Sequence, residues 1–291
     1  MSGRTAYRLA WGRHVLELGR RTCIMGVVNV TPDSFSDGSL FFDVEAAVAQ
    51  AEKLAAEGAD ILDIGGESTR PFSNPISAEE EIRRVVPVIA ALAGRIWAPI
   101  SIDTAKAAVA QAALQAGAAM INDISALRFD PHMGRVAAEF GAPVILMHMR
   151  GEPRTMQVDP HYAELVTDIT GFLSEAAAAA ERQGIPRERL IVDPGIGFGK
   201  TPDHNLQLIK RLRELAALDL PILVGPSRKW FIRRLLKPDG AKDISPLLPV
   251  VATGTQAAVT AAILNGAHIV RVHDVADTVA TVKVVDAILN A

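Results

Sequence analysis

The stretch AAEGADILDIGG, residues 55–66, contains the repeating unit that decides the fold. An alanine-rich segment of helical character ends at Gly58, and the chain then enters an apolar run that becomes polar at Asp63. Glycine adopts the left-handed conformation that ends a helix, so the pattern predicts a helix followed directly by a buried strand. The same order of helix, glycine and strand recurs in LQAGAA, AEFGAP and LNGAH.

Outward from this unit, short apolar runs alternate with longer segments of helical period along the whole chain. This alternation is typical of a parallel sheet whose strands are connected by helices. Eight candidate strands occur, at residues 23–30, 59–66, 99–104, 119–125, 143–149, 189–195, 221–226 and 267–274. They predict an α/β protein with a single (β/α)8 TIM barrel over residues 23–291, and a doubly wound open sheet is the weaker alternative. Residues 1–22 form a short N-terminal extension that can fold as a β-hairpin.

Composition places the chain among folded globular proteins. Hydrophobic residues make up 49% and charged residues 22% of its 291 positions, which excludes wholesale disorder. A net charge of −3 offers no broad attraction for nucleic acid or for an anionic membrane. Cys23 is the single cysteine, which excludes an intramolecular disulfide and a cysteine-rich metal site. Because neither a signal peptide nor an apolar run of about 18 residues is seen, we expect a cytoplasmic protein.

Several motifs that would point to other chemistry are absent from the sequence. The run PGIGFGKT, residues 194–201, has Pro194 where a phosphate-binding loop needs its first glycine, and its glycines do not fit the dinucleotide-binding spacing. The histidines form no HExxH pair for zinc, and no GxSxG elbow presents a serine nucleophile. The sequence therefore argues against nucleotide binding, zinc hydrolysis and serine hydrolysis.

Polar residues follow the predicted strands at their carboxyl ends. In a barrel these ends surround one mouth, so residues remote in sequence converge on a single pocket. The polar ends are Asn29, residues 63–70, Asp103, Asn122 with Asp123, His148, Asp193, residues 227–229 and His273.

One group at these ends, Asp103, Asn122, Asp193 and Lys229, suits a flat heterocycle. A buried carboxylate can accept two parallel N–H bonds from an amidine-like edge, such as a pterin or guanine ring presents. Burying a carboxylate without a partner costs several kcal/mol, so the residues favour a ligand. The structural alternative is a salt bridge between Asp103 and Lys229 inside the barrel.

Apolar and aromatic residues near the mouth have two readings. Met147 and Phe198 can stack on a flat ring, although packing is the commoner role of such side chains. We expect Trp97 and Trp230 to pack between the helices and the barrel.

A second group of strand-end residues carries donors or positive charge and suits a phosphate or pyrophosphate: Asn29, Thr69, Arg70, Arg271 and His273. Asn29 can also offer its amide oxygen to a Mg²⁺ ion that bridges such a group. Arg271 and His273 alternate along one strand and should share a face. The alternatives are a solvated loop arginine for Arg70 and a His273 that is satisfied by Asp274.

Taken as a set, these stretches resemble the dihydropteroate synthase family. NVTPDSFSDG and GGESTRP are similar to its two mobile active-site loops, and SIDT, INDI, LMHM, DPGIGFGKT, GPSRK and RVHDV follow in the order that the family shows. The resemblance extends from about Cys23 to the C-terminus. It implies a (β/α)8 barrel that condenses 6-hydroxymethyl-7,8-dihydropterin pyrophosphate with p-aminobenzoate, giving 7,8-dihydropteroate and pyrophosphate in folate synthesis.

The resemblance also implies a role for each matching residue. The pterin would contact Asp103, Asn122, Met147, Asp193, Phe198 and Lys229. The pyrophosphate would contact Asn29, Thr69, Arg70, Arg271 and His273, with Asn29 also a ligand of Mg²⁺. The p-aminobenzoate would contact Phe35, Thr69, Pro71, Ser227 and Lys229. The catalytic residues would be Asp37, Arg70, Lys229, Arg271 and His273.

The family mechanism implied here is dissociative: pyrophosphate leaves first, and the arylamine attacks a pterin-stabilised cation. The resemblance further implies a sulfonamide target and a homodimer, for which the apolar helix at residues 250–266 is a candidate surface. Three alternatives remain: a pterin-binding methyltransferase that uses methyltetrahydrofolate, a non-catalytic pterin-binding paralogue and a purely structural barrel. The methyltransferase has no use for NVTPDSFSDG or PSRK. The non-catalytic paralogue does not explain the intact Thr69, Arg70, Ser227 and Lys229, and a purely structural barrel would not need so many polar strand ends.

Overall fold

The computed structural model describes residues 4–31, 40–68 and 73–291. It contains the eight predicted barrel strands within these ranges. Their bounds are β3 (Cys23–Asn29), β4 (Ile61–Gly65), β5 (Ile100–Asp103), β6 (Met120–Asp123), β7 (Val144–Met147), β8 (Leu190–Asp193), β9 (Leu223–Val224) and β10 (Ile269–Val272).

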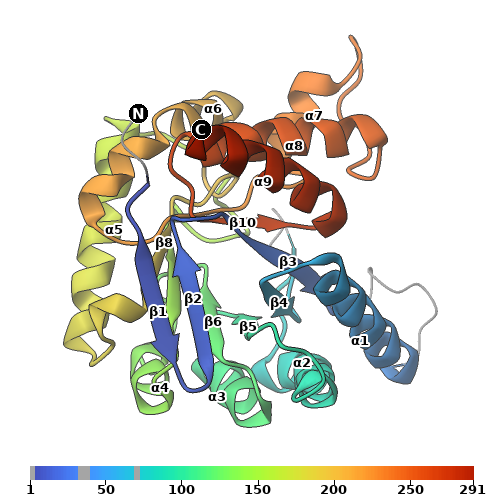
Figure 1. The fold of residues 1–291 in the computed structure, drawn as a ribbon, viewed down its shortest axis with the longest axis vertical. Coiled ribbons are helices and arrows are strands. Elements are labelled where there is room, and N and C mark those ends of the chain that lie inside the picture. Colours follow the sequence, from blue (N-terminus) through green and yellow to red (C-terminus); the bar gives the residue numbers. More distant parts are fainter. Residues whose placement is uncertain (1–3, 32–39, 69–72) are drawn as a thin grey trace.

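The strands form one parallel sheet in the order β8-β7-β6-β5-β4-β3-β10-β9. A parallel bridge between Val192 and Ile222 brings the two ends of this order together, and the Val192 N–H donates to the carbonyl of Pro221 at 2.9 Å. The sheet therefore closes into a barrel (Figure 1), and the open doubly wound sheet is excluded.

The helices lie outside the strands (Figure 1). They are α1 (Leu40–Glu57), α2 (Ala78–Leu92), α3 (Ala107–Ala116), α4 (Met133–Phe140), α5 (Leu165–Arg182), α6 (Pro202–Lys210), α7 (Trp230–Leu236), α8 (Pro249–Leu264) and α9 (Val275–Asn290), with short 3₁₀ helices η2 (Arg187–Arg189) and η3 (Leu212–Leu218). The glycines of the four repeats, Gly58, Gly117, Gly141 and Gly266, all have positive φ, between 60° and 120°. The predicted helix ends are therefore confirmed.

Alternation along each strand divides the apolar residues into two layers. On β10, Val270 and Val272 belong to the layer between strands and helices, whereas Ile269 belongs to a cluster inside the barrel. The same division holds on β6, where Ile121 packs outward and Met120 inward. Every second strand residue thus points into the barrel, and this decides which of the polar strand ends can meet.

The N-terminal extension folds as the expected hairpin, with β1 (Tyr7–Trp11) antiparallel to β2 (His14–Leu18). Its apolar face consists of Leu9, Trp11, Leu16 and Leu18, and it packs against inward-facing barrel residues such as Met25 and Ile145. The indole N–H of Trp11 donates to the carbonyl of Ala119 at 2.8 Å. The hairpin therefore covers the end of the barrel opposite the polar mouth. The division into an extension and one catalytic domain stays a prediction.

The packing role expected for the two tryptophans is wrong for Trp97. Its side chain lies between α2 and β5 and is 97% exposed, while Trp230, the first residue of α7, is 44% exposed. Short connections that cross the surface expose even large side chains, and composition alone does not reveal this.

Among the described residues, the helices are too short or too polar to cross a membrane.

Candidate active site

Strand alternation brings the predicted floor residues together. Asp103 on β5 and Asn122 on β6 are register partners, and both have the inward parity. Asp193 is the last residue of β8 and lies two positions after the inward-facing Ile191, so it also faces the barrel interior. Arg271 lies two positions after the inward-facing Ile269 on β10, and His273 lies one residue beyond the end of that strand, so their sharing a face stays a prediction.

Arg271 connects two carboxylates on neighbouring strands. Its Nε donates to Oδ2 of Asp63 at 2.6 Å, and its Nη2 donates to Oδ2 of Asp103 at 2.7 Å. Asn122 donates from Nδ2 to the same Asp63 oxygen at 2.9 Å. One guanidinium therefore fixes the barrel floor, because the planar fork of arginine can serve two acceptors at once.

Asp63 is a site residue that the sequence reasoning did not single out. Its side chain is fully buried, and among the described residues its Oδ1 has no hydrogen-bond partner. The signal was present, because Asp63 begins the polar end of the 59–66 run and has inward parity. Asp123, another aspartate at a polar strand end, points outward instead. Its carboxylate accepts the backbone N–H groups of Ser125 and Leu127.

Asp193 is almost entirely buried, and it accepts the N–H of Gly195 on Oδ1 at 2.7 Å. Its other oxygen has no hydrogen-bond partner among the residues that the structure describes. Burial raises the pKa of Asp193 to about 6, against the opposing effects of the Gly195 N–H and Lys229. A carboxylate held in this way is ready to accept N–H groups from a ligand, which would compensate the cost of its burial.

The other charged groups of the floor are perturbed as well. Burial raises the pKa of Asp103 to about 7. The positive charge of Arg271 opposes this rise, and the negative charge of Asp63 adds to it. Burial, followed by repulsion from Arg271, lowers the pKa of Lys229 to about 8. For Arg271, burial disfavours the charge, but Asp63 and Asp103 outweigh it and the pKa is raised. Strong shifts clustered in one concave region are typical of an active site.

Lys229 and Phe198 form the wall beside this floor. The Lys229 ammonium lies 4.0 Å from the centre of the Phe198 ring, and among the described residues it has no carboxylate within ion-pairing distance. A side chain at Gly197 would come within 3.0 Å of the Lys229 stem, so this glycine makes room for the lysine. The predicted alternative, a salt bridge between Asp103 and Lys229, is wrong because Asp103 pairs with Arg271.

Met147 and Phe198 do lie together near the mouth. Both belong to a small buried cluster with Ile124, Met149 and Met156, separate from the two main layers. Their positions fit both a stacking role and simple packing, so their contact with a ring stays a prediction.

Ser227 and His273 form a second polar unit at the mouth. The Ser227 Oγ lies 2.9 Å from Nδ1 of His273 and accepts the backbone N–H of His273 at 3.2 Å. Asp274, the partner considered for His273 from the sequence, instead makes a two-point contact with Arg228 at 2.5 and 3.2 Å. Ser227 therefore contributes to the orientation of the imidazole ring.

Asn29 ends β3 at the mouth, half-buried and paired in register with Gly65. Within residues 4–31, 40–68 and 73–291, no group of three His, Cys, Asp or Glu side chains is arranged to hold a metal. The amide oxygen of Asn29 is an oxygen ligand of the kind that Mg²⁺ accepts, and Mg²⁺ usually keeps several waters and takes further ligands from substrate phosphates.

Five predicted site residues, Phe35, Asp37, Thr69, Arg70 and Pro71, lie outside the described residues. The segment just before residues 69–72 is described and is firmly held. Lys106, which precedes α3, donates at 2.6 Å to both Glu67 and the buried Glu81. Glu67 also accepts the N–H of Ile76 at 3.1 Å, so the two flanks of residues 69–72 are linked.

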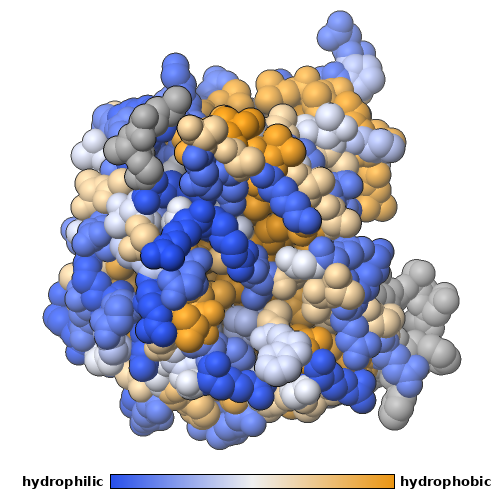
Figure 2. All heavy atoms as spheres, in the orientation of Figure 1, coloured by the Kyte–Doolittle hydropathy of each residue, from blue (hydrophilic) through white to orange (hydrophobic). Residues whose placement is uncertain are grey.

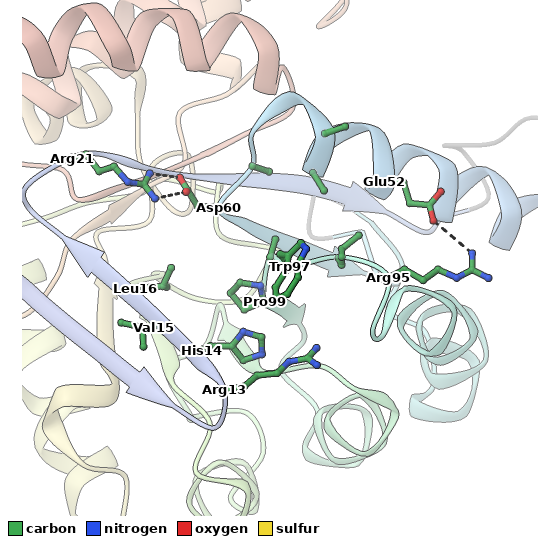
Figure 3. Close-up of a pocket in the computed structure, with 15 residues that line it drawn as sticks. Arg13, His14, Val15, Leu16, Arg21, Glu52, Asp60, Arg95, Trp97 and Pro99 are labelled. Atoms are coloured by element: carbon green, nitrogen blue, oxygen red, sulfur yellow. Dashed lines mark hydrogen bonds and ion pairs between the residues drawn. The ribbon is translucent and has the colours of Figure 1, made fainter.

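A separate surface cleft lies away from these residues. It has a volume of about 670 Å³ and is lined by the hairpin tip, the end of α1 and the connection into β5. Figure 3 shows Trp97 there, facing Arg13 and His14 of the hairpin, with Arg21 bound to Asp60 nearby. The cleft contains none of the predicted site residues. It lies at the amino-terminal end of the barrel, where side chains serve stability rather than catalysis.

Comparisons with known proteins agree with this geometry. Residues 25–273 match a family model described as pterin binding enzyme. The chain is 46% identical over 278 residues to a protein of Synechocystis sp. named dihydropteroate synthase, with 95% of this chain and 93% of that protein covered.

Solved structures give the same result. A dihydropteroate synthase of Xanthomonas albilineans with 4-aminobenzoic acid superimposes with a TM-score of 0.89 at 45% identity, covering 99% of this chain and 100% of that one. A Yersinia pestis dihydropteroate synthase in complex with a sulfonamide drug gives a TM-score of 0.89 at 42% identity, covering 97% and 99%.

Proposed function

The chain belongs to the dihydropteroate synthase family of pterin-binding enzymes, and we infer that it condenses 6-hydroxymethyl-7,8-dihydropterin pyrophosphate with p-aminobenzoate. The products are 7,8-dihydropteroate and pyrophosphate. One observation of the site carries this reading: Asp193 is buried and Asp103 is 14% exposed at the same mouth, and each keeps one carboxylate oxygen without a partner among the described residues. The family membership favours the synthase over the methyltransferase and over a purely structural barrel.

The pterin binds to the floor of the mouth in this proposal. Asp193 and Asp103 accept the N–H groups of the ring, and Asn122 and Lys229 serve its remaining acceptors and donors. Phe198, held beside the Lys229 ammonium, packs on the face of the ring. Binding replaces water around two costly buried charges, which is why the floor is specific for a ligand rich in N–H groups.

Departure of pyrophosphate is the step that needs positive charge. Arg271 on β10 and His273, one residue beyond that strand, are proposed to stabilise the negative charge that develops on the leaving group. Asp63 and Asp103 hold Arg271 in place before the substrate arrives, so little reorganisation is needed. The same carboxylates lie close to the cation that remains on the pterin.

Asn29 is the residue proposed to hold Mg²⁺, through its amide oxygen. When bound, the ion would supply further stabilisation of the charge on the departing pyrophosphate. Assay of pyrophosphate release with and without added Mg²⁺ tests this assignment.

The p-aminobenzoate is proposed to lie beside Ser227 and Lys229, on the open side of the pterin. An arylamine is neutral at pH 7, so its nitrogen can attack without a base first removing a proton. Roles for Phe35, Asp37, Thr69, Arg70 and Pro71 in holding this substrate and excluding water follow from the resemblance alone.

A homodimer and a cytoplasmic location complete the proposal. Apolar side chains that are exposed on α7, α8, α9 and the connection before α8 support a self-association surface, and Figure 2 shows apolar atoms gathered over these elements. Those side chains include Leu235, Leu247, Val250, Val284 and Ile288. The inward side of α8 packs on its neighbours through Val251 and Val259, and the exposed side of the helix is the one proposed for self-association. Light scattering at increasing protein concentration tests the dimer.

The function is tested by pyrophosphate release from the pterin substrate, measured with and without p-aminobenzoate, together with mass spectrometry of the product. We expect release coupled to dihydropteroate formation, and release that depends on added Mg²⁺. Sulfonamides should compete with p-aminobenzoate. A purified enzyme that forms no dihydropteroate, or that transfers a methyl group from methyltetrahydrofolate, would contradict the proposal.

A further inference from the structure

The loop at residues 194–199 carries Phe198 and is held in an unusual way. Three successive carbonyls each accept a hydrogen bond from a side chain. Gln157 donates to the carbonyl of Gly197 at 2.6 Å, Lys200 to that of Phe198 at 2.9 Å, and Tyr162 to that of Gly199 at 2.7 Å. A loop with glycines of positive φ at 195, 197 and 199 has little intrinsic preference for one conformation, so these contacts fix it.

Lys200 is the buried member of this set. It is 1% exposed, and its ammonium lies 2.9 Å from Nδ1 of His148 and 3.4 Å from the carbonyl of the same residue. Together with the carbonyl of Phe198, these atoms provide three acceptors for the three N–H groups of an ammonium. No carboxylate within the described residues lies within ion-pairing distance of Lys200. A lysine buried without a counter-ion is costly, and packing alone would be served better by an apolar residue.

The protonation of the neighbours agrees with these donor and acceptor roles. Burial, with repulsion from Lys200, lowers the pKa of His148 to about 2, so its ring is neutral and can accept on Nδ1. Burial lowers the pKa of Lys200 to about 7, while the charge of Asp193 opposes this change. The ammonium therefore persists mainly because three acceptors and a nearby carboxylate stabilise it.

The loop that Lys200 holds contacts three parts of the pterin floor. Its Gly195 N–H donates to Asp193, its Gly197 packs against the stem of Lys229, and its Phe198 ring faces the Lys229 ammonium. A shift of the loop would therefore displace Asp193, Lys229 and Phe198 together. The p-aminobenzoate residue Ser227 is held separately, by His273.

We propose that Lys200 is a positioning residue of the pterin site, which acts by clamping the carbonyl of Phe198 and the backbone of His148 so that the 194–199 loop presents its floor contacts to the ring. The proposal rests on the function proposed above. It predicts a larger loss of affinity for the pterin than for p-aminobenzoate, because the loop contacts Asp193, Lys229 and Phe198 of the pterin floor, whereas Lys229 is the one p-aminobenzoate residue among these contacts.

The test compares Lys200→Met with a matched control, Lys210→Met, at an exposed position of α6. Methionine keeps most of the volume of lysine and removes the donors. We expect Lys200→Met to raise the Kd of 6-hydroxymethyl-7,8-dihydropterin about tenfold in calorimetry and to raise KM for the pterin pyrophosphate similarly. KM for p-aminobenzoate should rise less than KM for the pterin substrate, because Lys229 alone is shared with the loop contacts, and the melting temperature should change little, because removal of a costly buried charge offsets the loss of its hydrogen bonds.

A second variant, Lys200→Gln, keeps one N–H donor for the carbonyl of Phe198 and should recover part of the pterin affinity. It also provides the comparison if Lys200→Met does not fold. Unchanged pterin Kd in both variants would overturn the proposal, as would equal losses for both substrates with a lower melting temperature, which would indicate a merely structural lysine. Because pterin binding is measured without turnover, a wild-type protein that binds pterin but makes no dihydropteroate would contradict the proposed function and leave this comparison intact.

Discussion

Asp63 on β4 and Arg271 on β10 meet across β3, with Nε of the arginine donating to Oδ2 of the aspartate at 2.6 Å. The two residues are far apart in sequence, and only closure of the barrel places them together. Asp63 also accepts from Asn122, and Arg271 also binds Asp103, so this contact is the centre of the floor. It orients the cation that the proposed reaction needs for the departing pyrophosphate.

Asp63→Asn should show how much the orientation of Arg271 by Asp63 matters, because the variant keeps the charge of Arg271 itself. The amide can still accept one hydrogen bond, but Arg271 then has only Asp103 as a charged partner. We expect kcat/KM to fall about 10- to 100-fold, which corresponds to the loss of one charge-assisted hydrogen bond. Steady-state kinetics check this, with the exposed Asp239→Asn as control. Wild-type kinetics in Asp63→Asn would show that the contact is dispensable.

Asp193→Asn should weaken pterin binding without destabilising the fold. Burial raises the pKa of Asp193 to about 6 in the folded protein, above the value of about 3.9 in an unfolded chain. The folded state therefore binds this proton more tightly, and it bears the full cost of the buried charge above pH 6. We expect the variant to be more stable at neutral pH by on the order of 1–3 kcal/mol, with the difference shrinking as pH falls from about 6 to about 4. Denaturant unfolding at several pH values measures this, and a variant less stable at neutral pH would contradict it.

The pH dependence of kcat/KM for the pterin substrate should be bell-shaped. Burial raises the pKa of Asp193 to about 6 and of Asp103 to about 7, so pterin binding should strengthen as these carboxyls ionise. Burial lowers the pKa of Lys229 to about 8 and of Lys200 to about 7, so activity should decline as they lose their protons. The observed limbs belong to the coupled group rather than to single residues. A flat profile from pH 5 to pH 9 would show that these groups do not control binding.

Ser227→Ala should release the imidazole of His273. The hydroxyl is buried and accepts the backbone N–H of His273 while it holds the ring at Nδ1. We expect kcat to fall about tenfold, with a loss of stability of about 1–3 kcal/mol from the unpaired N–H. The exposed Ser174→Ala on α5 is the matched control. If Ser227→Ala retained the wild-type kcat, the orientation of His273 would not depend on this hydroxyl.

The hairpin should contribute to stability and not to catalysis. Leu9 is 1% exposed against the barrel interior, whereas Val15 on β2 is 49% exposed. We expect Leu9→Ala to lower the free energy of unfolding by about 2–5 kcal/mol and Val15→Ala to have little effect. Both should keep the wild-type KM values, because the hairpin covers the opposite end of the barrel from the mouth. Equal stability of the two variants would contradict the packing described here.

Most of the fold could be predicted because the decisive signals are local. Apolar runs, helical periods and the glycines after four helices depend only on neighbouring residues, and they were enough to locate all eight barrel strands. The floor residues Asp103, Asn122, Asp193 and Lys229 were also singled out from the sequence, because the first three lie at the polar ends of strands and Lys229 lies in the polar loop after β9. Phe35, Asp37, Thr69, Arg70 and Pro71 lie outside the described residues, so their roles stay predictions.

What the sequence missed depends on contacts between distant segments. In the sequence, Lys200 looks like part of a glycine-rich loop. Only its burial against His148 in the structure shows that it lies beneath the pterin floor. Trp97 reads as a packing residue, yet it is exposed because nothing in the described fold covers the short connection that carries it.

The sequence by itself determined which segments become strands and helices, and it determined which strand ends are polar, because backbone preferences and apolar periodicity are local properties. Only the tertiary structure decided the partners: Arg271 with Asp63 and Asp103, and Ser227 with His273. The reason is physical. Barrel closure and the inward direction of alternate strand residues decide which charged groups come close to one another. The burial of each charged group then decides how strongly it needs a partner.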